Sequence, residues 1–109
     1  MSGKGYLGEF EQMVLLAILQ RGEEAFALEV RRELEGSADR TVSRGAFYTT
    51  LDRLEQKGYV RWSKAMPENG RGGAMRRFEV TEAGLEALRA SRAALQNLWR
   101  GLEDMLEGA

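Results

Sequence analysis

The chain has 109 residues, of which 43% are hydrophobic, and a formal net charge of −1 at neutral pH. This length predicts one domain, or one small domain with an appendage. Cysteine and histidine are both absent, which excludes disulfides and thiolate metal sites and removes the usual general base and the commonest metal ligand. We therefore expect no enzymatic activity, no metal site and no cofactor.

The acidic balance of the whole chain conceals a basic middle third. Residues 40–80 carry nine lysines and arginines against four acidic residues, whereas residues 1–39 and 81–109 are both net acidic. A local basic surface is what binding to phosphates requires, and the overall charge is only a proxy for it. The charge distribution thus permits a nucleic-acid interface in the middle of the chain.

The sequence predicts neither a membrane-spanning segment nor an export signal. The longest apolar run, Met13–Leu19, falls short of the roughly 18 residues that a membrane-spanning helix needs. The N-terminal sequence MSGKGYLGEF contains no hydrophobic region of a signal peptide. We expect a cytoplasmic protein with no membrane partner.

The first predicted helix runs from about Glu9 to Arg21 and ends at Gly22. It is apolar around most of its circumference, so it is either the central helix of the core or also covered by a second subunit. Its apolar residues are Phe10, Met13, Val14, Leu15, Leu16, Ala17, Ile18 and Leu19.

Two further helices predict a helix-turn-helix. The second helix is expected at about Ala25–Glu35, stopped by Gly36, and the third at Ser43–Gly58, between an N-cap residue and a C-terminal glycine. A connection of about six turn-type residues joins them, which fits this motif.

The third helix has one apolar side and one polar side. Phe47, Leu51 and Leu54 recur at helical spacing and predict the buried side. Hydroxyl and guanidinium groups on the other side can reach phosphates and base edges in a DNA major groove. The alternative is an ordinary surface helix with solvated polar residues. The polar side and its flanks carry Arg44, Gly45, Tyr48, Thr49, Asp52 and Arg53.

After Gly58 the apolar pattern changes to the alternation of a β-hairpin. Residues 59–66 and 76–81 are the predicted strands, and the loop between them holds the only proline. A basic hairpin directly after a helix-turn-helix predicts a winged helix-turn-helix. Arg71, at the tip of this wing, is placed to enter a minor groove or to touch a phosphate. The basic residues that flank it are Lys64, Arg76 and Arg77.

Thr81 is the predicted N-cap of a long final helix, roughly Glu82–Glu107, about 39 Å long at 1.5 Å per residue. The small domain cannot bury this length, so we expect the helix to pair with a second copy of the chain, the alternative being packing on its own domain. The residues expected in the dimer interface are Phe10, Met13, Leu88, Leu95, Leu98, Trp99, Leu102 and Leu106.

The predicted fold is therefore mainly α with a small β-hairpin. Residues 1–81 form a winged helix-turn-helix DNA-binding domain and residues 82–109 a C-terminal dimerisation helix. Trp99 either fills the interface or lines a cavity with Leu95 and Met13. Such a cavity would accept a small aromatic effector by stacking, and a cationic one would gain further from the indole faces.

Taken together, five segments resemble the PadR family of bacterial transcription regulators. They are LGEFEQMVLLAIL, EEAFALEVRREL, SRGAFYTTLDRLEQKGYVRW, RGGAMRRFEVTEAG and LW of the final helix. The length, with one C-terminal helix, is similar to that of the short subfamily. The resemblance implies a homodimeric winged-helix repressor of a nearby operon, associated with the nucleoid and released by a small molecule, often aromatic or a toxic drug.

The resemblance also implies which residues contact DNA. The partner would be a palindromic double-stranded operator. Two alternatives stay open, a winged-helix dimer that binds protein instead of DNA and a dimer that binds small molecules without direct DNA reading. A positive charge on the face from Ser43 to Arg53 would favour DNA over protein. The implied contacts are Ser43, Arg44, Tyr48, Thr49 and Arg53 in the helix, with Lys64, Arg71, Arg76 and Arg77 in the wing.

Overall fold

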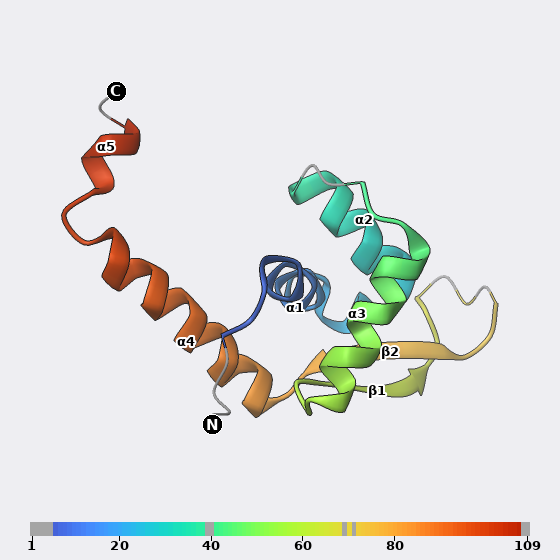
Figure 1. Ribbon diagram of the computed structural model, residues 1–109. Coiled ribbons are helices and arrows are strands. Elements are labelled where there is room, and N and C mark those ends of the chain that lie inside the picture. The colour runs from blue at the N-terminus through green and yellow to red at the C-terminus, as the bar shows by residue number, and fades with distance from the viewer. Residues whose placement is uncertain (1–5, 39–40, 69, 71, 108–109) are drawn as a thin grey trace.

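The computed structural model describes residues 6–38, 41–68, 70 and 72–107, with the backbone alone at 106 and 107. Within these residues the chain is mainly helical with one antiparallel hairpin, as predicted (Figure 1). In chain order the elements are α1 (Glu9–Arg21), a short 3-10 turn (Gly22–Glu24), α2 (Ala27–Ser37), α3 (Arg44–Gln56), β1 (Val60–Ala65), β2 (Met75–Val80), α4 (Glu82–Trp99) and α5 (Glu103–Glu107).

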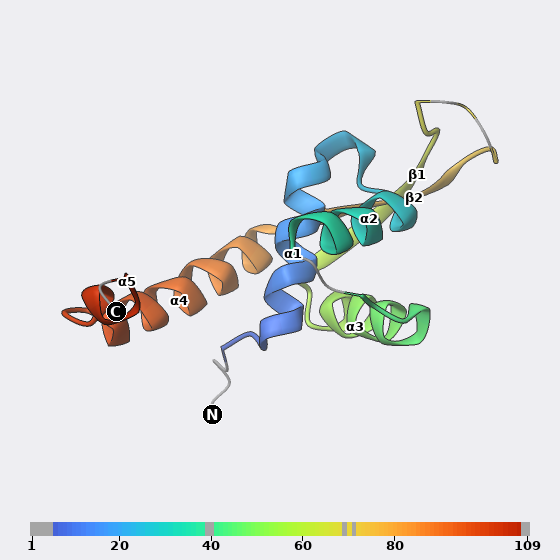
Figure 2. The ribbon, with the colours of Figure 1, turned by 90° about the horizontal axis from the view of Figure 1, so that it is seen from above.

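The helix α1 is the centre of the fold. It lies between α4 on one side and α2 and α3 on the other, in both views (Figure 1 and Figure 2). Val14, Leu15 and Ile18 are buried there, and each such side chain contributes about 1.5–3 kcal/mol on leaving water. Leu16 stays 50% exposed and Leu19 44% exposed. The central-helix interpretation therefore explains most of this apolar helix, and one side of it remains uncovered.

The second helix, α2, begins and ends two residues later than predicted. The helix begins at Ala27 because the preceding residues are held in an extended conformation by the hairpin. The Phe78 N–H donates to the Ala25 carbonyl at 2.9 Å, and Phe26 forms an antiparallel bridge with Arg77. At the other end α2 continues through Gly36 to Ser37, so this glycine does not stop it.

The ends of α3 are formed as predicted. The Ser43 hydroxyl accepts a hydrogen bond from the Ala46 N–H at 3.1 Å, which satisfies one unpaired donor of the first turn. Gly58 lies just past the helix with a φ of 81°, a conformation that favours glycine. The chain then turns directly into β1.

The hairpin follows the predicted alternation. The strands β1 and β2 pair with Val60 opposite Val80, Trp62 opposite Phe78 and Lys64 opposite Arg76. Side chains alternate across a strand, so these pairs share one face of the hairpin, and Val60 and Phe78 bury its base in the core.

The start of α4 is packed tightly against the end of α3 and the hairpin. The Thr81 hydroxyl accepts from the Gly84 N–H at 3.1 Å and donates to the Gly58 carbonyl at 2.6 Å. A Cβ atom on Gly84 would lie 2.4 Å from the Tyr59 carbonyl oxygen and 2.8 Å from Val80 Cγ1. Only glycine permits this approach.

The prediction of one uninterrupted final helix was wrong. The helix α4 ends at Trp99, and Gly101 adopts a φ of 82° before the short α5 begins. Glycine is a weak helix former and reaches positive φ without strain, which accounts for the break. The longest helix therefore has 18 residues and spans about 27 Å instead of about 39 Å.

The helix α4 leaves the core and makes the molecule elongated. The radius of gyration is 15.7 Å, against about 13 Å for a compact domain of this length. In both views α4 and α5 extend from the end opposite the wing (Figure 1 and Figure 2). None of the helices in the described residues is long and apolar enough to cross a membrane.

The close approach at Gly84 generates a stability prediction. Gly84→Ala should lower the free energy of unfolding by about 1–3 kcal/mol, because the new methyl group must displace backbone and a packed side chain. Gly36→Ala is the control, since it lies in α2 with nothing within 4 Å of the new atom, and it should be neutral or stabilising by up to about 1 kcal/mol. Urea unfolding at equal protein concentration measures both. Equal stability of the two variants would contradict the packing described here.

Candidate nucleic-acid interface

The polar side of α3 is fully presented to solvent. Phe47, Thr50, Leu51 and Leu54 are buried and fix the orientation of the helix. All the residues predicted on the other side are exposed, namely Ser43, Arg44, Tyr48, Thr49 and Arg53.

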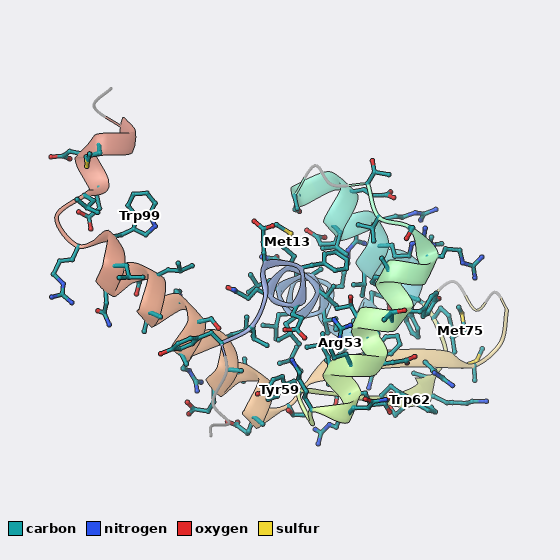
Figure 3. The ribbon with its side chains drawn as sticks, viewed as in Figure 1. Met13, Arg53, Tyr59, Trp62, Met75 and Trp99 are labelled. Carbon is teal, nitrogen blue, oxygen red and sulfur yellow. The ribbon has the colours of Figure 1, made fainter. Side chains whose placement is uncertain are left out.

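This surface has a centre and two flanks. At 100° per residue, Gly45, Thr49 and Asp52 point away from the core. The other two predicted groups lie apart, with Tyr48 on the flank toward the hairpin and Arg53 on the flank toward α1, as Figure 3 shows for Arg53. The charged residues from Ser43 to Arg53 are two arginines and one aspartate, so this face carries a net positive charge.

A nearly buried carboxylate anchors the α1 flank. Glu11 accepts a hydrogen bond from the Gly8 N–H at 3.0 Å and one from Lys57 Nζ at 2.9 Å. Burial alone would raise the pKa of Glu11, but these two hydrogen bonds and the charges of Lys57 and Arg53 outweigh it and lower the pKa. The pair joins the C-terminal end of α3 to the start of α1.

The hairpin flank is anchored by an aromatic ring. Trp62 Nε1 donates a hydrogen bond to Glu55 Oε2 at 3.0 Å, and the guanidinium carbon of Arg76 lies 4.3 Å from the centre of the indole ring. Figure 3 shows Trp62 beside the C-terminal half of α3. Lys64 faces Arg76 across the two strands, so both predicted wing cations stand on the hairpin face that contacts α3.

The remaining predicted wing residues are placed differently. Arg77 lies on the opposite face of the hairpin, 4.0 Å from Glu79. It lines a shallow hollow with Glu23, Glu24 and Glu68. The structure thus separates Arg77 from the cations beside α3. Arg71 lies outside the described residues.

Sequence reasoning missed Glu55 and the second role of Trp62. Trp62 lies in the first predicted strand, residues 59–66, and the tryptophan packs partly on the core. The indole N–H of Trp62 could have indicated this contact, because a half-buried tryptophan needs a hydrogen-bond acceptor. The acceptor comes from a different element, so spacing along the chain did not reveal it.

A second surface is apolar and lies on the projecting helix. Leu95 is 52% exposed, Leu98 75% and Trp99 38%, and Leu102, in the turn after α4, is also exposed. The other predicted interface residues, Phe10, Met13 and Leu88, are partly buried against the core, and the Leu106 side chain lies outside the described part of the chain.

A hollow of 480 Å³ lies between α1 and α4. Of the three predicted effector residues it contains Trp99 and Leu95, whereas Met13 lines a separate hollow of 190 Å³ between α1 and α2. Two arginines border the larger hollow and no carboxylate belongs to its lining. The lining residues are Gln12, Leu16, Leu85, Leu88, Arg89, Arg92, Leu95, Gln96 and Trp99.

Comparison with known proteins gives a consistent result. The family described as the transcriptional regulator PadR-like family matches residues 15–90. Solved structures with the same fold include a PadR-like transcriptional regulator from Bacillus cereus, with 22% identity, a TM-score of 0.74 and coverage of 92% of this chain and 93% of that one. A Streptococcus transcriptional regulator has 22% identity, a TM-score of 0.71 and coverage of 88% and 90%.

A PadR family regulator from Eggerthella lenta has 23% identity, a TM-score of 0.65 and coverage of 93% and 88%. No curated protein sequence matches the chain. At these identities the likenesses establish the winged-helix fold and leave residue roles to the geometry.

The Glu11–Lys57 pair generates a pH prediction. Because the folded pKa of Glu11 is lowered from the ordinary 4.5, its contribution to stability is complete above that pH and is lost as pH falls through the folded pKa. Glu11→Gln should cost about 1 kcal/mol at pH 7, a modest figure because Lys57 is 43% exposed. It should also lose less stability than the wild type between pH 6 and pH 3. Lys57→Met should flatten the same profile, and parallel curves for wild type and both variants would contradict the assignment.

Proposed function

Because the chain belongs to the PadR-like family of transcriptional regulators, we propose that it is a homodimeric repressor that binds a palindromic operator and is released by a small aromatic effector. Members of this family regulate transcription by binding DNA, so the chain is a DNA-binding regulator and not an enzyme. The observation that carries the proposal is the continuity of the exposed face of α3 with the cations Lys64 and Arg76 on the hairpin.

In this proposal α3 enters the major groove and the wing follows the adjacent backbone. Ser43 and Arg44 lie at the start of the helix, where phosphates are favoured, and Tyr48, Thr49 and Arg53 meet the groove walls and floor. Lys64, Arg71 and Arg76 bind phosphates or the minor groove. Arg77 faces the other way, among carboxylates, and the proposal assigns it no contact with DNA.

A protein partner on this face is the rival function. The acids on this face are Asp52 at its centre and Glu55 on its hairpin flank, and the two arginines on the helix and two cations on the hairpin outnumber them. A surface that is net positive beside a helix N-terminus suits phosphates better than an acidic or neutral protein surface. The charge of the face therefore favours DNA.

Dimerisation would cover the apolar surface of α4. Leucines exposed over more than half of their area are unusual in a monomer when they lie together on one helix. The uncovered Leu16 and Leu19 of α1 offer a second apolar surface. A twofold pair built on these surfaces would present two α3 helices to two half-sites, about one helical turn apart.

The effector would occupy the hollow beside Trp99. The indole of Trp99 offers a stacking surface. Arg89, in the same lining, forms an ion pair with Glu86 at 3.2 Å. The charge of Arg92 makes a planar aromatic anion the better ligand, in contrast to the cation expected from the indole alone. A ligand that widens the dimer would change the spacing of the two α3 helices, so it would weaken DNA binding.

The DNA interface is tested with the promoter upstream of the gene for this protein. Affinity should fall at least about tenfold between 0.1 and 0.3 M salt, because phosphate contacts release counterions. Lys64→Ala should weaken binding to all sequences similarly, whereas Thr49→Ala should change the ranking of operator variants. Arg61→Ala, on the opposite face of β1, is the control. Fluorescence anisotropy measures all of these, and an affinity indifferent to salt would contradict the model.

The dimer is tested by placing one negative charge on the apolar surface of α4. Leu98→Glu should yield a folded monomer at micromolar concentration in analytical ultracentrifugation, because the side chain is exposed within one chain and buried only by a partner. Ala93→Glu, exposed on the opposite side of α4, should leave the dimer intact. A wild type that sediments as a monomer would defeat the proposal.

The effector site is tested by fluorescence in a Trp62→Phe background, where Trp99 is the remaining tryptophan. Planar aromatic carboxylates should quench Trp99 and lower the affinity for DNA, and matched aromatic cations should bind more weakly. Arg92→Gln should reduce that preference for anions. Equal binding of both ligand charges would contradict the role of Arg92.

A further inference from the structure

Arg76, Trp62 and Glu55 form a continuous stack that joins the wing to the DNA-reading helix. The carboxylate of Glu55 accepts from the edge of the indole at 3.0 Å, and the guanidinium of Arg76 covers its face at 4.3 Å. Glu55 belongs to α3, Trp62 to β1 and Arg76 to β2. We name this arrangement the Trp62 clamp.

The clamp leaves the donors of Arg76 available. A guanidinium stacked on a ring uses its face, while its N–H groups point outward in the plane of the group. No described residue accepts a hydrogen bond or forms an ion pair with Arg76 in this structure, and the side chain is exposed. Such a group is positioned, charged and ready to bind an oxyanion.

The Trp62 clamp also opposes the electrostatic repulsion between Lys64 and Arg76. Lys64 stands directly across the ladder from Arg76, and like charges in this position push each other away. The negative Glu55 on the indole N–H makes the ring a better partner for a cation, because hydrogen bonds polarise their neighbours. The stack therefore holds Arg76 on the α3 side of the hairpin instead of letting it swing away.

We propose that Trp62 and Glu55 are positioning residues that hold Arg76 against the phosphate between the groove read by α3 and the groove reached by the wing. This inference rests on the proposed DNA-binding function, and it assigns the ring and the carboxylate no contact with DNA. Arg76 alone touches the phosphate, and Trp62 and Glu55 act through it. An anchored arginine loses less freedom on binding, so the clamp raises affinity and fixes the angle of the wing.

The position of the stack explains why it would act at this phosphate. Trp62 and Arg76 share the hairpin face that meets α3, and the wing and the start of α3 lie toward the same end of the molecule in both views (Figure 1 and Figure 2). A sugar–phosphate strand separates the major groove from the minor groove. A cation on the surface between helix and wing meets that strand.

The first experiment compares Glu55→Ala with Glu55→Gln in DNA binding. Both remove the same negative charge, which by itself strengthens binding to phosphates. The glutamine keeps an acceptor for the indole N–H and the alanine does not. We expect Glu55→Ala to bind about 3–10-fold more weakly than Glu55→Gln. Equal affinities of the two variants would overturn the role of Glu55.

The second experiment is a double-mutant cycle between Trp62→Leu and Arg76→Ala. Loss of the ring should weaken DNA binding when Arg76 is present and have no further effect when it is alanine. Independent, additive losses would show that Trp62 acts on DNA by another route and would overturn the proposal. Circular dichroism and urea unfolding check that each variant keeps its fold.

A third measurement needs no DNA. In a Trp99→Phe background Trp62 is the single tryptophan, and Arg76→Ala or Glu55→Ala should shift its emission more than Glu55→Gln does. If the wild type binds no DNA at any salt concentration, the proposed function fails, and this inference with it, whatever the emission shows. If it binds DNA but the cycle is additive, only the inference fails.

Discussion

The burial of α1 is the constraint on which the other elements depend. Its apolar circumference gives α2, α3, β2 and α4 a common partner, so none of them needs a large apolar face of its own. The helix α3 can therefore keep four buried side chains on one side and expose polar groups on the other. In physical terms, one strongly hydrophobic helix supplies the core, so that a neighbouring helix can keep one side polar and exposed to solvent.

Two polar contacts then orient α3 on the core. The Glu11–Lys57 pair ties the end of α3 to α1, and the indole of Trp62 ties α3 to the hairpin. Because these contacts lie on opposite flanks of α3, they limit its rotation about its own axis. Hydrophobic packing alone is non-directional, so these directional contacts add to the four buried side chains of α3 in orienting the helix.

The sequence predicted those features that depend on neighbouring residues along the chain. Caps at Ser43 and Thr81, the glycine at 58 and the alternation of the two strands all gave the correct elements. Two features depended on contacts between distant segments and escaped prediction. They are the extended residues before α2, which pair with β2, and the Trp62 clamp. Gly101 was visible in the sequence, but the apolar residues that continue past it to Leu106 favoured one long helix.

The glycine contact at the root of α4 has a mechanical consequence. Gly84 fits against the Tyr59 carbonyl and Thr81 is bonded to Gly58, just past the end of α3, so the root of α4 is fixed to the end of α3. The helix extends about 27 Å from this root, so a rotation of about 10° at the root corresponds to about 5 Å at the end beside Trp99. Because the root is joined to the end of α3, such a rotation would act on α3 with a displacement several times smaller.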